Sequence, residues 1–196
     1  RPEQQFQFPR VPRTTVPPNP TETPAADAGA AMAITVTHLS AAAASLTWAL
    51  WERIKFGRAS MVGLVTGTIA GLASVTPAAG FISPIEALII GAIAGVLCQE
   101  VVSFVRSKLV VDDTLDVFAV HGVGGIFGTI MIAAFGAGTW TAQLGSLAIV
   151  GVWTTVVTVG LIYICRAVTS LRVEDETETT GLDLAVHGER AYDLNS

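Results

Sequence analysis

Residues 85–105, IEALIIGAIAGVLCQEVVSFV, form an apolar stretch whose only charged residues are Glu86 and Glu100. A helix that crosses a lipid bilayer needs about 20 mostly apolar residues. The two glutamates lie near the ends of the stretch, where long side chains can reach the membrane interface, and Arg106 and Lys108 follow it. We therefore predict a transmembrane helix here.

Four further stretches are apolar over a similar length, and they run over residues 28–51, 61–81, 117–135 and 144–168. The whole chain is 51% hydrophobic and only 14% charged, whereas about 25% of residues are charged in an ordinary soluble domain. Its mean hydropathy is +0.58. The sequence therefore predicts an all-α fold, a polytopic membrane helix bundle of about five transmembrane helices, with residues 27–170 as the membrane domain.

Glycine recurs at every fourth position in three of these stretches. The repeats are Gly63, Gly67 and Gly71, then Gly91 and Gly95, then Gly124 and Gly128. Such spacing places small residues on one helix face, where the backbone of a neighbouring helix can approach closely. We therefore expect a tightly packed bundle. Cys98 and Cys165 fit no metal-ligand or redox spacing, and we interpret them as small core residues.

The two flanking segments have a different composition. Residues 1–26 contain seven of the nine prolines and few apolar side chains, so we expect a disordered lead. Residues 171–196 hold seven acidic residues, so the negative net charge of the chain is largely local to this tail. Its EDETETT segment is expected only to be solvated, and no basic surface suggests a nucleic-acid partner.

The basic residues between the predicted helices all fall on one side of the membrane. They are Arg53, Lys55 and Arg58 after the first helix, Arg106 and Lys108 after the third, and Arg166 and Arg172 at the end of the fifth. The loops TPAAGFISPIE and GAGTWTAQ contain no Lys or Arg. The positive-inside rule then predicts a cytosolic carboxyl terminus and an external amino terminus. The three arginines of the lead oppose this rule.

His121 lies in an apolar, glycine-rich run, LDVFAVHGVGG. The residues before it predict a helix start, in which Asp113 or Thr114 caps the amide groups and Asp116 adds negative charge in the first turn. His121 would then lie about 10 Å along the helix from Thr114, below the interface of a hydrocarbon core about 30 Å thick. A neutral imidazole at that depth indicates a functional group, and the alternative is a histidine that hydrogen-bonds a neighbouring helix.

Four motifs together resemble the ammonium transporter family (Amt/MEP/Rh). They are TPAAGFISP (residues 76–84), ALIIGAIAGVLC (87–98), DDTLDVFAVHGVGGIFG (112–128) and GLDLAVHGERAY (181–192). The resemblance implies a bundle of eleven helices, usually trimeric, with a narrow pore through each protomer, of which this chain resembles the last five helices. It also implies that His121 is the second of two pore histidines, that Thr76 lies near the pore, and that Asp116 is a structural acid.

The resemblance does not extend to the first half of the family fold. The first pore histidine, the aromatic gate, the external recruitment residues and the acid thought to assist deprotonation have no counterpart in this sequence. We therefore expect a truncated chain that does not conduct alone, and the alternative is a variant that assembles from two chains. His38 could be mistaken for the missing histidine, but it falls on another helix and is expected to pack.

The tail motif resembles the regulatory terminus of the family, whose usual partner is a PII-type signalling protein. The residues that carry this resemblance are Gly181, His187, Gly188, Glu189 and Tyr192.

The function that these features imply is ammonium or ammonia transport across the plasma membrane, with the lipid bilayer as the surroundings and a homotrimer as the assembly. The alternative is a non-conducting membrane protein, vestigial or interacting, that presents a PII-binding tail. The sequence contains no nucleophile–base pair, phosphate loop or metal cluster, so we predict no enzyme activity, no cofactor and no metal.

Overall fold

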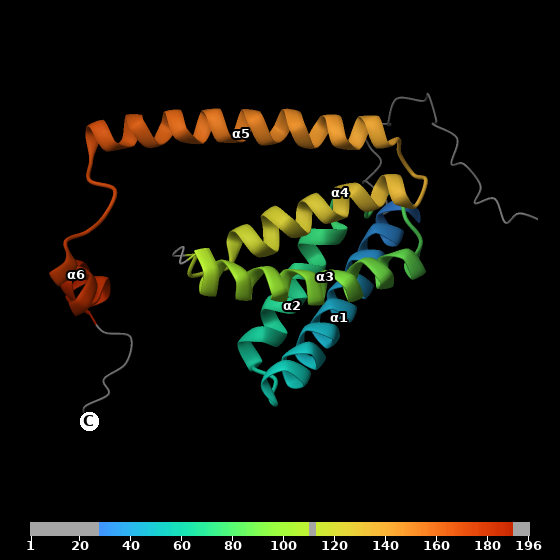
Figure 1. The fold of residues 1–196 in the computed structure, drawn as a ribbon, viewed down its shortest axis with the longest axis horizontal. Helices are drawn as coiled ribbons and strands as arrows, with labels where there is room; N and C mark the ends of the chain where they lie inside the picture. The colour runs from blue at the N-terminus through green and yellow to red at the C-terminus, as the bar shows by residue number, and fades with distance from the viewer. Residues whose placement is uncertain (1–27, 110–112, 190–196) are drawn as a thin grey trace, which may run out of the picture. The chain divides into compact units, whose positions relative to one another are not determined.

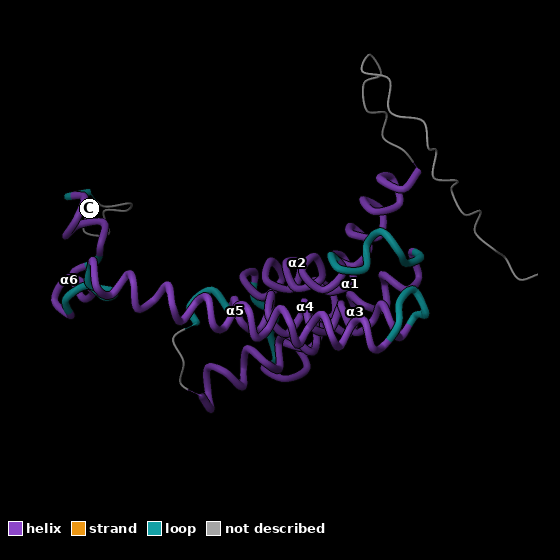
Figure 2. Tube along the Cα trace, turned by 90° about the horizontal axis from the view of Figure 1, so that it is seen from above, coloured by secondary structure: helices purple, strands orange, loops and turns teal. Residues whose placement is uncertain are grey.

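The structure is a computed structural model that describes residues 28–109 and 113–189. All regular elements within these residues are helical, and they are joined by loops (Figure 2). The chain divides into two compact units, Arg1–Met131 and Ile132–Ser196. The predicted all-α fold is confirmed, while the predicted lead at residues 1–26 lies outside the described residues.

The first unit is built on three long helices that pack against one another, α1 (Ala28–Phe56), α2 (Met61–Val75) and α3 (Pro84–Phe104) (Figure 1). The π-helix η1 (Val105–Leu109) continues α3. A second π-helix, η2 (Phe118–Val123), packs against α2 and α3 and leads into α4 (Gly124–Ala134).

The helices of this unit meet at their glycines, as the fourfold spacing predicts. A Cβ atom added to Gly91 would collide with the backbone carbonyl of Ser40 on α1, and one added to Gly71 would lie 2.5 Å from the same oxygen. The hydroxyl of Ser40 donates a hydrogen bond of 2.9 Å to the carbonyl of Gly71. Close backbone contact of this kind holds membrane helices together where no hydrophobic driving force acts between them.

We expect Gly91→Ala to destabilise the bundle, because the added methyl group meets backbone rather than a side chain that can move. Overpacking of this kind costs about 1–3 kcal/mol. Thermal unfolding in detergent, followed by circular dichroism, measures the effect. Gly145→Ala is the matched control, since a Cβ atom there meets nothing within 4 Å. Equal melting temperatures for the two variants would contradict this account of the packing.

Local sequence explains where α2 and α3 begin and where α2 ends. Ser60 caps α2 by accepting from the Gly63 amide, and Ser83 forms a capping box with Glu86 at the start of α3. The predicted helix over residues 61–81 is wrong beyond Val75, because the chain turns over residues 76–81. Pro77 has no amide to continue the helical hydrogen bonds.

The other predicted boundaries also shift. The first helix continues to Phe56, the fourth is divided into η2 and α4, and the fifth begins four residues early as α5 (Trp140–Val168). Three helical segments are long and apolar enough to cross a membrane, Gly29–Phe56, Pro84–Leu109 and Trp140–Val168. The segments Met61–Val75 and Phe118–Ala134 are apolar but shorter. All five predicted stretches therefore contain apolar helices, but within the described residues only three of the five predicted transmembrane helices have the length to cross a membrane.

The second unit contains α5, α6 (Asp175–Thr180) and the π-helix η3 (Asp183–His187). No residue of α5 is buried. Cys165 on α5 is exposed, so its predicted place in a core is wrong within the described chain, whereas Cys98 is buried in the first unit. The EDETETT segment, expected only to be solvated, forms the short helix α6, and all its residues except the half-buried Thr177 are exposed.

Candidate functional site

His121 lies in η2, on the face that points away from the packed core. Ala119 and Val120 of the same π-helix are 1% and 2% exposed and face α2 and α3. The side chain of His121 is exposed within the described chain. The imidazole is therefore presented outward by an element whose other face is fixed against two helices.

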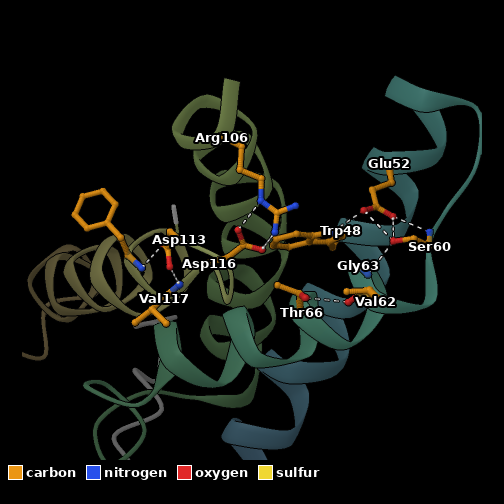
Figure 3. A network of polar contacts seen from close by, with 11 residues as sticks. Trp48, Glu52, Ser60, Val62, Gly63, Thr66, Arg106, Asp113, Asp116 and Val117 are labelled. Atoms are coloured by element: carbon orange, nitrogen blue, oxygen red, sulfur yellow. Dashed lines mark hydrogen bonds and ion pairs between the residues drawn. The ribbon is translucent and has the colours of Figure 1, made fainter. Parts of the chain in front are cut away.

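Asp113 caps the start of this element. Its Oδ1 and Oδ2 atoms accept hydrogen bonds of 2.9 Å from the backbone amides of Val117 and Phe118 (Figure 3). The first amides of a helix have no carbonyl partner within the helix, so a carboxylate at this position stabilises its beginning.

Asp116 is held by Arg106, which the sequence marks only as a basic residue after a predicted helix. Arg106 donates from Nε to Oδ1 of Asp116 at 2.9 Å and from Nη2 to Oδ2 at 2.7 Å (Figure 3). Asp116 is 9% exposed and, at φ 55°, is the one non-glycine residue in the described ranges with a positive φ. Nothing in the sequence signals this pairing, because the partners are ten positions apart, one on η1 and the other in the segment before η2.

The same end of the first unit carries a second polar cluster. Glu52 accepts from the indole nitrogen of Trp48 at 3.1 Å and from the backbone amide of Ser60 at 2.8 Å. Nearby, Glu100 accepts from the ammonium group of Lys55 at 2.7 Å. Because α1, α2 and α3 run alternately up and down, their charged ends gather at the side to which we assigned the basic loops.

A cavity of about 340 Å³ opens within this polar end, between α1, α2, α3 and η1, and Asp116, just before η2, also lines it. The polar residues that line it include Glu52, Thr66, Gln99, Arg106 and Asp116. The side-chain oxygen of Gln99 is buried and has no hydrogen-bond partner among the described residues. Sequence reasoning missed this cavity, because its lining comes from four elements.

The structure does not bring Thr76 into contact with His121. Thr76 closes the far end of α2, where its hydroxyl donates to the carbonyl of Leu72 at 2.6 Å. Gly124 lies against Ser74, since a Cβ atom there would be 2.8 Å from the Ser74 hydroxyl. Gly128 meets the same residue more closely, since a Cβ atom there would collide with the Ser74 carbonyl. His121 precedes, and Thr76 follows, the stretch over which the two helices meet.

His38 is exposed on α1, and no hydrogen bond joins its ring to another described residue. The packing role predicted for it therefore finds no support within the described ranges.

The tail residues lie on and around η3. Gly188 takes the left-handed conformation, at φ 68°, and closes η3 with a hydrogen bond from its amide to the carbonyl of Leu184. Gly181 also has a positive φ, at 97°. His187 and Glu189 are exposed, and Tyr192 lies outside the described residues. This segment forms a short exposed turn of helix rather than an enclosed site.

Residues 19–192 match the model of the Ammonium Transporter Family. The chain belongs to the ammonium transporter family. The ammonium transporter of Aquifex aeolicus is 37% identical over 183 residues, which cover 86% of this chain and 43% of the relative. That of Bacillus subtilis is 37% identical over 172 residues, which cover 80% and 43%. The resemblance drawn from the four motifs is thus confirmed.

Solved structures agree with this assignment. A structure named Sensor Amt Protein superposes with a TM-score of 0.70 at 29% identity and covers 82% of this chain and 42% of that chain. The crystal structure of Candida albicans Mep2 superposes with a TM-score of 0.67 at 30% identity and covers 76% and 37%. The chain spans less than half the length of these relatives.

Proposed function

We propose that this chain forms part of a pathway for ammonium or ammonia across the plasma membrane, with His121 as a polar station on that pathway. One observation carries the proposal. His121 is presented outward from a π-helix whose opposite face is packed, so a further part of the family fold can cover it. The test is ammonium-dependent transport by the chain joined to an amino-terminal half of a family member.

The chemistry of the substrate supports a histidine at this place. A bare ammonium ion is costly in hydrocarbon, so passage requires either loss of a proton or replacement of its hydration shell by polar groups. A neutral imidazole can accept a hydrogen bond, donate one, or relay a proton. Thr76 is proposed to lie near the pathway as well, and Asp113 and Asp116 to act in building the helix start. No step of this proposal uses a metal or a cofactor.

We propose a multi-pass topology in which residues 27–170 form the membrane domain and residues 171–196 a cytosolic regulatory tail. The gathering of Lys55, Arg106 and the polar cavity at one end of the first unit supports a single cytosolic side. A homotrimer is the proposed assembly of the complete family fold.

A reporter fused after Ser196 is expected to read as cytosolic, and one fused before Arg1 as external. The reason is the one-sided distribution of Lys and Arg over the loops. Paired alkaline phosphatase and fluorescent protein fusions measure the two ends. Cytosolic signals from both ends would contradict an odd number of spans.

The tail is proposed to dock a PII-type regulator, because η3 and the residues around it are exposed and carry the motif of the regulatory terminus. This contact would serve the conducting form, and it is also what the alternative function, a non-conducting membrane protein, would retain.

Deletion of residues 181–192 is expected to weaken binding of a PII-type protein to the membrane form at least about tenfold, the loss expected for about 1.4 kcal/mol of contact. Surface plasmon resonance on the chain in nanodiscs measures the affinity. Deletion of residues 175–180 removes α6 but keeps the motif, and should leave the affinity within about twofold. Unchanged binding after the first deletion removes the regulatory hypothesis.

A further inference from the structure

We propose that Arg106 is a positioning residue for His121, because its two-point ion pair with Asp116 fixes the start of η2 and so the direction in which the imidazole points. The consequence for transport rests on the function proposed above. The positioning itself is a property of this chain and can be tested without transport.

The first step is the geometry of the ion pair. The guanidinium group meets both oxygens of the Asp116 carboxylate, at 2.9 Å and 2.7 Å. Two parallel hydrogen bonds from a planar guanidinium group fix the orientation of the carboxylate as well as its distance. A lysine ammonium group cannot do this, because it acts as a single point charge. The Asp116 side chain is 12% exposed, whereas that of Arg106 is 56% exposed. The arginine thus reaches from the surface to hold a carboxylate that is nearly buried.

The second step is the backbone of Asp116. A left-handed conformation is uncommon in a non-glycine residue and persists only where the surroundings hold it. Asp116 is held at its side chain by Arg106 and at its backbone by two hydrogen bonds. Its amide donates to the carbonyl of Asp113 at 3.0 Å, and its carbonyl accepts from the amide of Val120 at 2.9 Å.

The third step leads from Asp116 to His121. Only Val117 separates Asp116 from the π-helix, and π-helical turns occur mostly as single turns, frequently at functional sites. A slip of one residue turns a helical side chain by a large angle, about 100° in an α-helix and somewhat less in the wider π-helix. Such a slip would carry His121 from the outward face toward the face that now buries Ala119 and Val120. The orientation of the imidazole therefore depends on how the start of η2 is fixed.

Arg106 and Asp113 act on η2 in different ways. The side chain of Asp113 bonds only to the first amides of its own helix start, so it stabilises η2 without tying it to another helix. Arg106 belongs to η1, which continues α3, and α3 is packed against α1 and α2. The ion pair therefore ties η2 to the rest of the bundle.

The experiment uses the full chain in nanodiscs with carbon-13 and nitrogen-15 in its histidine rings. The chain has three histidines, and single His→Ala variants assign their signals. Arg106→Gln and Asp116→Asn should each move the His121 signals by more than a linewidth, in the same direction, and leave those of His38 and His187 in place. The double variant should match the single ones, because either change breaks the same contact.

If Arg106 and Asp116 affected His121 only through their charges, the variants would change the His121 signals in a different pattern. Removing a positive and a negative charge near an imidazole acts in opposite directions on its titration, so the two variants would move the His121 signals oppositely and the double variant would restore them. Arg106→Lys keeps the positive charge but loses the two-point hydrogen bonding to Asp116. It should still move the His121 signals if the orientation of the Asp116 carboxylate matters.

Lys55→Gln is the matched control, because it breaks the other short ion pair at this end, that with Glu100. It should leave the His121 signals in place. The proposal is overturned if Lys55→Gln moves them as much as Arg106→Gln, if Arg106→Gln and Arg106→Lys leave them unmoved, or if Arg106→Gln and Asp116→Asn move them oppositely. Should Asp116→Asn fail to fold by circular dichroism, the two Arg106 variants decide the matter.

Transport then separates the two proposals. In the chain joined to an amino-terminal half, Arg106→Gln should lower transport, and adding it to His121→Ala should lower transport no further. If the joined chain does not transport in any form, the proposed function fails while the result from the histidine signals stands.

Discussion

Liposomes that contain this chain alone are expected to show no ammonium-dependent signal above that of empty liposomes. His121 offers one polar station, and its side chain is exposed within the described chain. A selective path also needs facing helices that exclude lipid, present a second hydrogen-bonding group and seal the path against water. The family resemblance implies a path between two inverted halves, as in other transporters built from such repeats, and this chain matches less than half of its relatives' length.

Joining the amino-terminal half of a close family member ahead of Asp27 should produce a signal. The measurement is the pH change inside liposomes after an ammonium pulse, with equal protein reconstituted in each sample. Matched liposomes with the amino-terminal half alone are the control. Robust, selective conduction by the unjoined chain would show that the other half is dispensable. Silence of the joined chain, folded and inserted, would favour the alternative of a non-conducting protein that presents its tail.

The helices could be predicted from the sequence because their signal is local. About twenty mostly apolar residues in a row favour a membrane-spanning helix over other structures. Glycine at every fourth position marks the helix faces that pack against one another. The end of α2 was placed too late because TPAAGF is itself apolar, so hydropathy continued past Pro77, the residue that stops the helical hydrogen bonds. The proline was the better signal there.

The details of the candidate site could not be predicted in the same way. A π-helix and an α-helix can carry the same apolar residues, so composition does not distinguish η2 from α4. The pair of Arg106 and Asp116 joins two elements, and its partners become neighbours only through tertiary packing. The exposure of His121 depends equally on which other segments cover it. Asp113 is different, since a cap bonds to amides a few residues away, and its place at the helix start follows from local sequence.

In the joined chain, His121→Ala is expected to lower ammonium transport about five- to thirtyfold, whereas His38→Ala should change it by less than about twofold. The first change removes a hydrogen-bonding group worth about 1–2 kcal/mol inside a membrane, and each 1.4 kcal/mol in a barrier is about tenfold in rate. His38 lies on α1, a different helix from the one to which the family resemblance assigns the pore histidine, so its loss should matter little.

A third substitution, His121→Asn, distinguishes how the imidazole acts. Asparagine donates and accepts hydrogen bonds but does not take up a proton near neutral pH. If His121 replaces part of the hydration shell of the substrate, His121→Asn should retain most of the transport that His121→Ala loses. If it relays a proton, the two variants should be equally impaired. Initial rates at saturating ammonium, with protein amount and helicity matched, measure all three variants. Equal effects of His121→Ala and His38→Ala would withdraw the special role of His121, since a general loss of packing would then explain both.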